Sequence, residues 1–137
     1  MARGGSFGLI LLAAAGLGLA WQIGPVPSAP AEAQTGAVRV IDGDTFDYRG
    51  ERIRIADIDT PEIQARCPEE ARLAAAATNR LRALLAQGPF ELVRSGRDED
   101  RYGRKLRVVV RHGRSLGDVL VREGLARTWT GRREPWC

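Results

Sequence analysis

The segment VRVIDGDTFDYRGERIRIADID, residues 38–59, contains three short strands separated by tight turns. Its apolar residues are mostly β-branched or aromatic and alternate with polar ones, a pattern typical of strands with one buried face. Glycine, aspartate and arginine interrupt the pattern where the chain has to turn. Strands joined this closely form a meander. The predicted strands are residues 38–41, 45–48 and 52–58, and the predicted turns are residues 42–44 and 49–51.

A helix is predicted after the meander, from Pro68 to a stop at Gly88. Proline suits the first helical turn, and Glu69 and Glu70 complement the positive end of the helix dipole. Glycine suits the position that follows a last turn. Apolar residues recur at three- and four-residue spacing and mark one buried face. They are Leu73, Ala77, Leu81, Leu84 and Leu85.

Two further strands, residues 90–94 and 105–111, flank a polar, glycine-bearing loop at residues 95–103. A second helix is predicted over residues 115–123, with a serine at its N-cap and a glycine after its last turn. A helix between the third and fourth strands of a five-stranded antiparallel set is the arrangement of an OB-fold barrel. We therefore predict an α+β fold for residues 36–137: a five-stranded OB-fold barrel with this helix and a C-terminal helix.

The N-terminal segment differs from the rest of the chain. Arg3 precedes an uncharged apolar run, residues 7–21, and a stretch rich in proline follows. This order is that of a secretory signal, and residues 31–33 offer the small residues that a signal peptidase reads. Extended to Ile23, the run also approaches the ~20 residues that cross a bilayer. Residues 1–33 are thus predicted to be a signal peptide or a membrane anchor with a linker, and the domain to be exported: periplasmic, secreted, or anchored outside the cytoplasm.

The composition, with 44% hydrophobic and 28% charged residues, argues against a disordered chain. The formal net charge is +4, and all but one of the 21 basic residues are arginine. Guanidinium groups match phosphate geometry, and a basic surface attracts polyanions. Charge alone, however, fits a soluble basic surface without a partner equally well.

The two cysteines, Cys67 and Cys137, permit one disulfide in an exported protein. It would tie the tail to the start of the first helix and, by closing a loop of about 70 residues, add roughly 4 kcal/mol of stability. Two free thiols are the alternative. A zinc site is disfavoured because His112 is the only histidine.

Three carboxylates follow the first and third strands: Asp44, then Asp59 and Glu62. In a meander, the turn after the first strand and the end of the third lie at the same end of the sheet, so Asp44 and Asp59 can converge. Their oxygens are hard ligands that suit Ca²⁺ or Mg²⁺. Aspartates at turns are also common because their side chains bond to nearby backbone. We prefer that simpler interpretation for Asp42, Asp47 and Asp57.

Two arginines complete a hydrolytic set. Arg54 points away from the strand face that carries the isoleucines, and Arg104 follows Gly103, where the backbone allows close approach by a ligand. A phosphodiester under attack by water gains negative charge, which fixed guanidinium donors stabilise. Carboxylates for a metal, one carboxylate for water and two arginines for phosphate together suit phosphodiester hydrolysis.

The sequence resembles the staphylococcal nuclease (thermonuclease) family in several blocks that occur in the same order. They are residues 40–45, Arg54 with residues 58–62, residues 100–104 and residues 120–126. The resemblance implies the OB-fold barrel already predicted and a Ca²⁺-dependent nuclease that cleaves DNA, RNA or both, leaving 3′-phosphates. It implies no obligate protein partner, and we expect a monomer.

The resemblance also implies a role for each site residue. Asp44 and Asp59 would bind Ca²⁺ or another divalent ion, with the backbone carbonyl of Thr60 as a further ligand. Glu62 would act as the general base or position the attacking water. The catalytic arginines that grip the scissile phosphate would be Arg54 and Arg104.

The chain departs from the best-known family members after residue 126. Their nucleotide-binding tyrosines have no clear match there, so Trp129 and Tyr102 are the candidates for contacts with bases. Trp129 packed against the barrel is an equally good interpretation. The long C-terminal helix of larger members is also missing, and we expect Trp136 and a Cys67–Cys137 disulfide to cover that flank.

Two other functions compete with an exported nuclease. One is an OB-fold module that binds nucleic acid and has lost catalysis; such a module has no need of the complete set of carboxylates and arginines present here. The other is a membrane-tethered domain that binds a partner protein. It rests on the N-terminal segment alone and leaves the site unexplained.

Overall fold

The computed structural model describes residues 36–137, and the predicted signal or anchor at residues 1–33 lies outside them. Within the described part of the chain, no helix is both long and apolar enough to cross a bilayer. The boundary between an export segment and a folded domain therefore stays a prediction.

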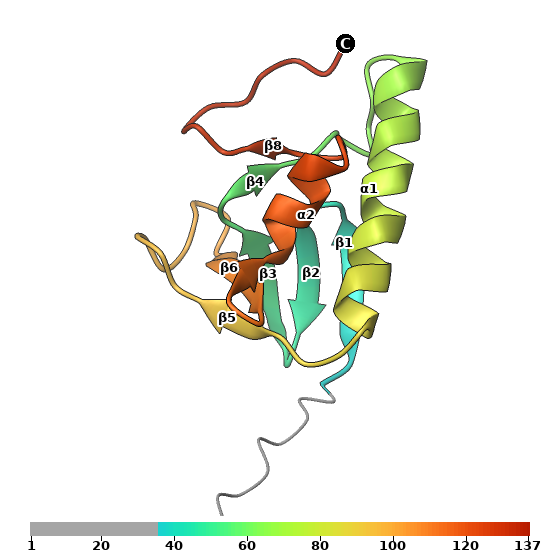
Figure 1. Ribbon diagram of the computed structural model, residues 1–137. Coiled ribbons are helices and arrows are strands. Elements are labelled where there is room, and N and C mark those ends of the chain that lie inside the picture. Colours follow the sequence, from blue (N-terminus) through green and yellow to red (C-terminus); the bar gives the residue numbers. More distant parts are fainter. Residues whose placement is uncertain (1–35) are drawn as a thin grey trace, which may run out of the picture.

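The predicted meander forms one side of the sheet, with β1 at its edge (Figure 1). Its strands are β1 (Val38–Asp42), β2 (Thr45–Tyr48) and β3 (Glu51–Ile55), paired antiparallel. Phe46 of β2 lies between Val40 of β1 and Ile53 of β3, which places apolar side chains in adjacent register. A bulge between Val40 and Asp42 bends β1 just before the turn that carries Asp44.

The second half of the sheet adds strands beyond β3. They are β5 (Glu91–Val93), β6 (Lys105–Arg111) and β7 (Arg114–Ser115), which give the strand order β1-β2-β3-β6-β5, with β7 also paired to β6. The α+β OB-like fold is thus confirmed. The prediction that all strands pair antiparallel is wrong for one pair: β3 and β6 run parallel. A parallel pair needs a long connection, and the first helix and β5 provide it.

The sheet is not closed into a barrel. Among the described residues β1 and β5 are the two ends of the strand order, with no pairing between them. The predicted helix, α1 (Pro68–Ala86), lies alongside β1 (Figure 1). Its last turn is held by Arg111 of β6, which donates to the carbonyls of Leu84, Gly88 and Pro89.

The predicted strand over residues 52–58 is interrupted. It ends at Ile55, and β4 (Ile58–Asp59) begins after a turn and pairs with β8 (Arg127–Thr128), a strand that the sequence did not indicate. Hydrogen bonds from residues distant in sequence stabilise this interruption of the strand. Asp57 accepts a hydrogen bond from the Ser115 hydroxyl (2.6 Å), and its carbonyl accepts one from the N–H of Trp129 (2.9 Å).

The second helix is α2 (Leu116–Arg122), and its N-cap is Ser115 as predicted, with the hydroxyl accepting from the N–H of Asp118 at 3.2 Å. The two helices and the sheet share one core. Its fully buried large side chains are Phe46, Ile53, Ile55, Ile58, Leu81, Leu120, Val109 and Pro61. On α1 the predicted buried face is present, although Leu73 is only half-buried.

Gly43 sits where β1 meets α1, and replacing it should destabilise the fold. A Cβ on Gly43 would lie 2.8 Å from the Cβ of Ala77 and 2.9 Å from the hydroxyl of Thr60. Since the Cβ of Ala77 cannot rotate away, α1 would have to move. We expect Gly43→Ala to lower the free energy of unfolding by about 1–3 kcal/mol in urea denaturation. An unchanged midpoint would show that this contact is not tight.

Candidate active site

Arg54 is the centre of the candidate site. It projects from β3, is buried, and its guanidinium Nη2 lies 3.1 Å from Oδ2 of Asp44 and 3.4 Å from Oδ1 of Asp59. Its Nη1 donates to the carbonyls of Ile55 and Ile58, the latter at 2.9 Å. The Arg54 side chain therefore contacts both the turn after β1 and the end of β4.

Asp44 also accepts hydrogen bonds from Thr60, which follows β4, and from its neighbour Thr45. The N–H of Thr60 donates to Oδ2 of Asp44 (3.1 Å), and the hydroxyl of Thr45 donates to Oδ1 (3.0 Å). The N–H of Asp44 donates to Asp42 (3.0 Å), which is the turn contact expected of Asp42. Asp44, Asp59 and Thr60 are thus adjacent and buried, at the same end of the sheet.

At this end of the sheet, burial disfavours the ionised form of two aspartates, Asp59 and Asp42. Burial raises the pKa of Asp59, and the neighbouring Asp44 raises it further, while Arg133 and Arg54 lower it. Burial also raises the pKa of Asp42, again with a contribution from Asp44. Crowded, buried oxygen donors of this kind are what a hard divalent cation binds, so Asp44 and Asp59 fit such an ion.

Glu62 lies in the loop that leads from β4 to α1. Its side chain is 44% exposed, and its Oε1 pairs with Nη1 of Arg133. Nε of Arg133 lies 3.5 Å from Oδ1 of Asp59, so one guanidinium links Glu62 to Asp59. Within residues 36–137, the carboxylates of Glu62, Asp44 and Asp59 do not all lie within 4.8 Å of one another.

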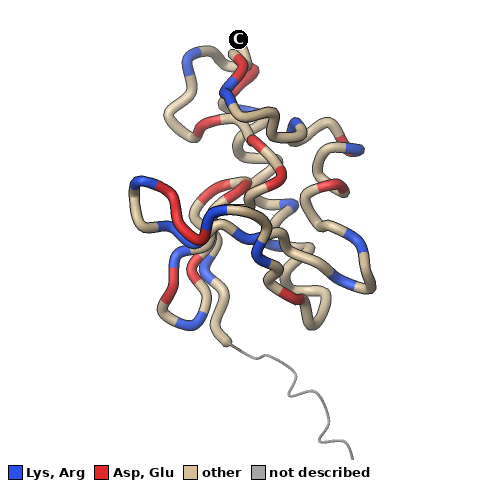
Figure 2. Tube along the Cα trace, turned by 90° about the vertical axis from the view of Figure 1, so that its left-hand side faces the viewer, with Lys and Arg blue, Asp and Glu red and all other residues tan. Residues whose placement is uncertain are grey.

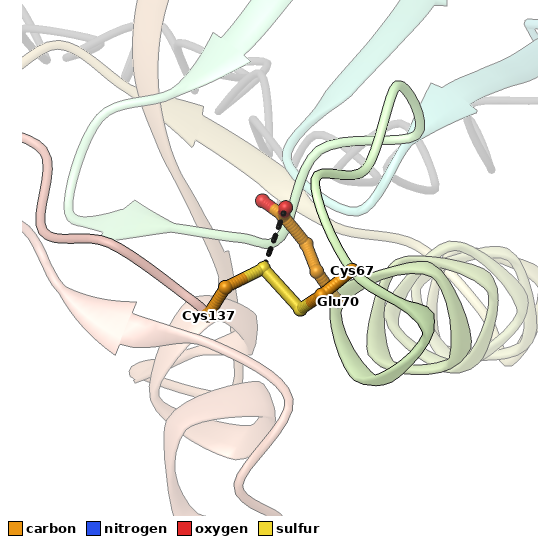
Figure 3. A group of neighbouring side chains, drawn as sticks. All are labelled: Cys67, Glu70 and Cys137. Atoms are coloured by element: carbon orange, nitrogen blue, oxygen red, sulfur yellow. Dashed lines mark hydrogen bonds between the residues drawn. A yellow bond between two sulfur atoms is a disulfide. The ribbon is translucent and has the colours of Figure 1, made fainter.

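Glu70, a buried carboxylate in the first turn of α1, holds this loop. It accepts hydrogen bonds from the N–H groups of Glu62 (3.4 Å) and Arg66 (2.7 Å). It also lies 3.5 Å from Sγ of Cys137, which is bonded to Sγ of Cys67 with the two Cα atoms 6.0 Å apart (Figure 3). The end of the chain is therefore attached beside the loop that carries Glu62.

Arg104 is held by a different carboxylate, Asp100. Nε of Arg104 donates to Oδ2 of Asp100 (2.7 Å), and the N–H groups of Arg104 and Tyr102 donate to Oδ1 (3.0 and 2.9 Å). Burial by itself would raise the pKa of Asp100, but these hydrogen bonds outweigh it and lower the pKa. Asp100 therefore stays ionised and fixes both the turn and the guanidinium of Arg104.

A cleft of about 510 Å³ lies beside Arg54 and Arg104, and its lining does not include Asp44, Asp59 or Glu62. Its lining includes Arg54, Arg104, Tyr102, Trp129 and Arg133. Both aromatic rings are exposed, Tyr102 by 67% and Trp129 by 39%. Elsewhere, basic and acidic positions are interspersed along the described chain (Figure 2). The cleft, rather than a broad basic face, is where arginines and aromatic rings meet.

Sequence reasoning missed three residues of this arrangement: Glu70, Asp100 and Arg133. Glu70 was interpreted only as a helix-dipole residue, and Asp100 only as part of a family block. The spacing of Asp100 and Arg104 across a glycine turn was an available signal for their pairing. Nothing local signals that Arg133 reaches Glu62, which is 71 positions away.

Trp136 packs against Arg127 of β8. The guanidinium of Arg127 covers its ring at 3.8 Å, and the ring is half-buried. Arg127 also donates to the carbonyls of Glu134 (3.3 Å) and Pro135 (3.0 Å). The tail is thereby folded back onto β8.

Comparison with known proteins supports the resemblance drawn from the motifs. A family model described as staphylococcal nuclease homologue matches residues 52–135, more than half of the chain. Endonuclease YncB of Bacillus subtilis (strain 168) is 35% identical over 94 residues, which cover 65% of this chain. The chain spans 44% of the length of that relative. From the family match, together with the motifs and the fold, the chain belongs to the family of staphylococcal nuclease homologues.

Proposed function

We propose that the chain is an exported, metal-dependent endonuclease that hydrolyses phosphodiester bonds of DNA, RNA or both. The observation that carries this proposal is the buried Arg54 between Asp44 and Asp59, at the edge of a cleft that also contains Arg104. Membership of a nuclease family and a relative named as an endonuclease support it. Export rests on the N-terminal sequence.

Asp44 and Asp59, with the backbone carbonyl of Thr60, would hold Ca²⁺ or another divalent ion. When bound, such an ion supplies positive charge that stabilises the charge developing on the phosphate. Their buried position next to Arg54 supports this assignment, since the carboxylates are already gathered and need little rearrangement.

Glu62 would take a proton from a water molecule as its oxygen attacks phosphorus. The bond from phosphorus to the 5′-oxygen then breaks, and this oxygen leaves with the bonding electron pair and takes up a proton to become a 5′-hydroxyl. The other product keeps a 3′-phosphate, as the family resemblance implies. Arg54 and Arg104 would donate hydrogen bonds to the phosphate oxygens, where negative charge grows in the transition state. Tyr102 and Trp129, both exposed in the cleft, would stack on the neighbouring bases.

The test is digestion of end-labelled single-stranded DNA and RNA by the full chain. We expect cleavage with Ca²⁺, none with excess EDTA, and 3′-phosphate ends on the products. Mg²⁺ and Mn²⁺ are tested in parallel, because hard oxygen ligands accept all three ions. A wild-type chain that binds the oligonucleotides and cleaves neither with any of these ions would instead be the catalytically inactive binding module.

Asp100→Asn should weaken catalysis through Arg104 without touching the substrate. The amide cannot accept the charged hydrogen bond from Nε of Arg104 as strongly, so the guanidinium loses its fixed position. We expect about a tenfold loss of kcat, of the size that one charge-assisted hydrogen bond contributes. Glu99→Gln, in the same loop but paired with Lys105, is the matched control. Equal rates for both variants would show that Asp100 does not support catalysis through Arg104.

A further inference from the structure

We infer that Arg133 is a third substrate-binding arginine, which holds a phosphate of the nucleic-acid strand in the cleft, and that the Cys67–Cys137 bond keeps it there. The inference rests on the proposed function and extends it to a residue outside the family blocks. Arg133 lines the same cleft as Arg54 and Arg104. Its guanidinium pairs with Glu62 and lies 3.5 Å from Asp59, so it reaches the centre of the site.

The tail that carries Arg133 is anchored at both ends. On one side Asp59 pairs with Arg127 in the β4–β8 ladder, and Trp129 donates to the carbonyl of Asp57. On the other side Cys137 is bonded to Cys67 at the start of α1. The segment between these anchors runs from β8 toward the start of α1 (Figure 1), and its Arg133 pairs with Glu62 in the loop before α1. Arg133 is thereby held over the site by its chain.

Stability alone does not account for this placement. The side chain of Arg133 is 51% exposed, and ion pairs with solvent access contribute little to folding. Arg132, the preceding residue, is 80% exposed, pairs with Glu134 and does not line the cleft that contains Arg54 and Arg104. The two residues share charge and segment and differ in whether they reach the cleft.

The chemistry of the cleft identifies the ligand. A guanidinium binds phosphate through two parallel hydrogen bonds, and a nucleic-acid strand presents a phosphate at every nucleotide. Because Arg54 and Arg104 are assigned to the scissile phosphate, Arg133 would bind a phosphate of a neighbouring nucleotide. On binding it exchanges the carboxylate of Glu62 for phosphate, which leaves Glu62 able to accept a proton.

The experiment measures binding without cleavage. Fluorescence anisotropy of a labelled 12-nucleotide single-stranded DNA is recorded in EDTA at several salt concentrations, with full-length chain from an oxidising compartment. Mass spectrometry first verifies the Cys67–Cys137 bond. We expect Arg133→Gln to raise Kd about tenfold or more and to reduce the slope of log Kd against log salt by about 0.7, the value for one lost phosphate contact on a single strand. Arg133→Lys should restore the slope.

Arg132→Gln is the matched control and should change Kd less than about twofold. Cys137→Ser, or reduction of the wild type, should reproduce the loss seen in Arg133→Gln, and the double variant should lose no more than either single one. Circular dichroism identifies any variant that fails to fold. If Arg133→Gln does not fold, Arg133→Lys still tests whether a positive charge at this position sets the salt slope.

Three results would overturn the inference. If Arg133→Gln kept the wild-type affinity and salt slope, Arg133 would not contact a phosphate. If it bound more tightly than the wild type, the guanidinium would block the cleft. Wild-type affinity in Cys137→Ser would show that the bond does not position Arg133. A wild type that binds but never cleaves refutes the proposed function alone and leaves these binding comparisons intact.

Discussion

Glu62→Gln is expected to reduce hydrolysis of single-stranded DNA by about 10²–10⁴-fold, the contribution typical of a positioned general base. Glutamine has nearly the same shape as glutamate and can still accept a hydrogen bond from Arg133, but it cannot take a proton from water. Because the Glu62 side chain is partly exposed, the fold should be unaffected. Single-turnover rates under saturating enzyme and thermal unfolding of the same samples measure the two effects separately.

Glu69→Gln is the control for Glu62→Gln. Glu69 carries the same charge in the first turn of α1, is exposed, and pairs with Arg72, away from the cleft. Its replacement should leave the rate within about twofold, since exposed charges at this distance are screened by salt. If Glu62→Gln cleaved as fast as this control, Glu62 would not activate water, and another residue near the phosphate would have to be the base.

Arg54→Met is expected to abolish activity and also to destabilise the metal-free chain by about 3–5 kcal/mol. Methionine fills much of the volume of arginine, so the main effect is the loss of the positive charge between Asp44 and Asp59. Asp44 would then lose its buried ion pair, and Asp59 would keep only the partly exposed Arg133 as a positive partner. For a domain of this size the unfolding midpoint should fall by more than about 10 °C.

The stability defect of Arg54→Met should depend on pH in a defined direction. Arg54 lowers the pKa of Asp59, so its removal raises that pKa further above the ordinary value of 3.8. The folded variant then binds more protons than the unfolded chain, and its stability falls as pH rises. The difference from wild type should therefore be largest at neutral pH and shrink as pH falls toward 4.

Arg52→Met is the control on the same strand. Arg52 pairs with Asp47 on the exposed side of the sheet, and its loss should change stability by no more than about 0.5 kcal/mol. A large loss in both variants would point to the strand rather than to the buried charges. No loss in Arg54→Met would mean that Asp44 and Asp59 are solvated or protonated without it.

Local sequence determined the elements that carry the site. Alternation over residues 38–55 specified the meander, the three- and four-residue spacing specified α1, and Ser115 specified the start of α2. The turn after β1 and the end of β3 meet in any meander, so strand order brought Asp44 close to the chain that follows β3 and leads to Asp59 in β4. These features depend on contacts between near neighbours, which periodicity and turn residues record.

Only the tertiary structure decided how the site is enclosed. The break after Ile55, the β4–β8 pair and the open edge between β1 and β5 depend on segments distant in sequence. Arg54 is buried although its strand pattern places it opposite the isoleucines, because Asp44 from the turn after β1 and Asp59 from β4 pair with it. Arg133 reaches Glu62 only because β8 and Cys137 hold the tail at both ends. Such contacts join residues with no common local pattern, since their energy comes from packing and charge across the folded chain.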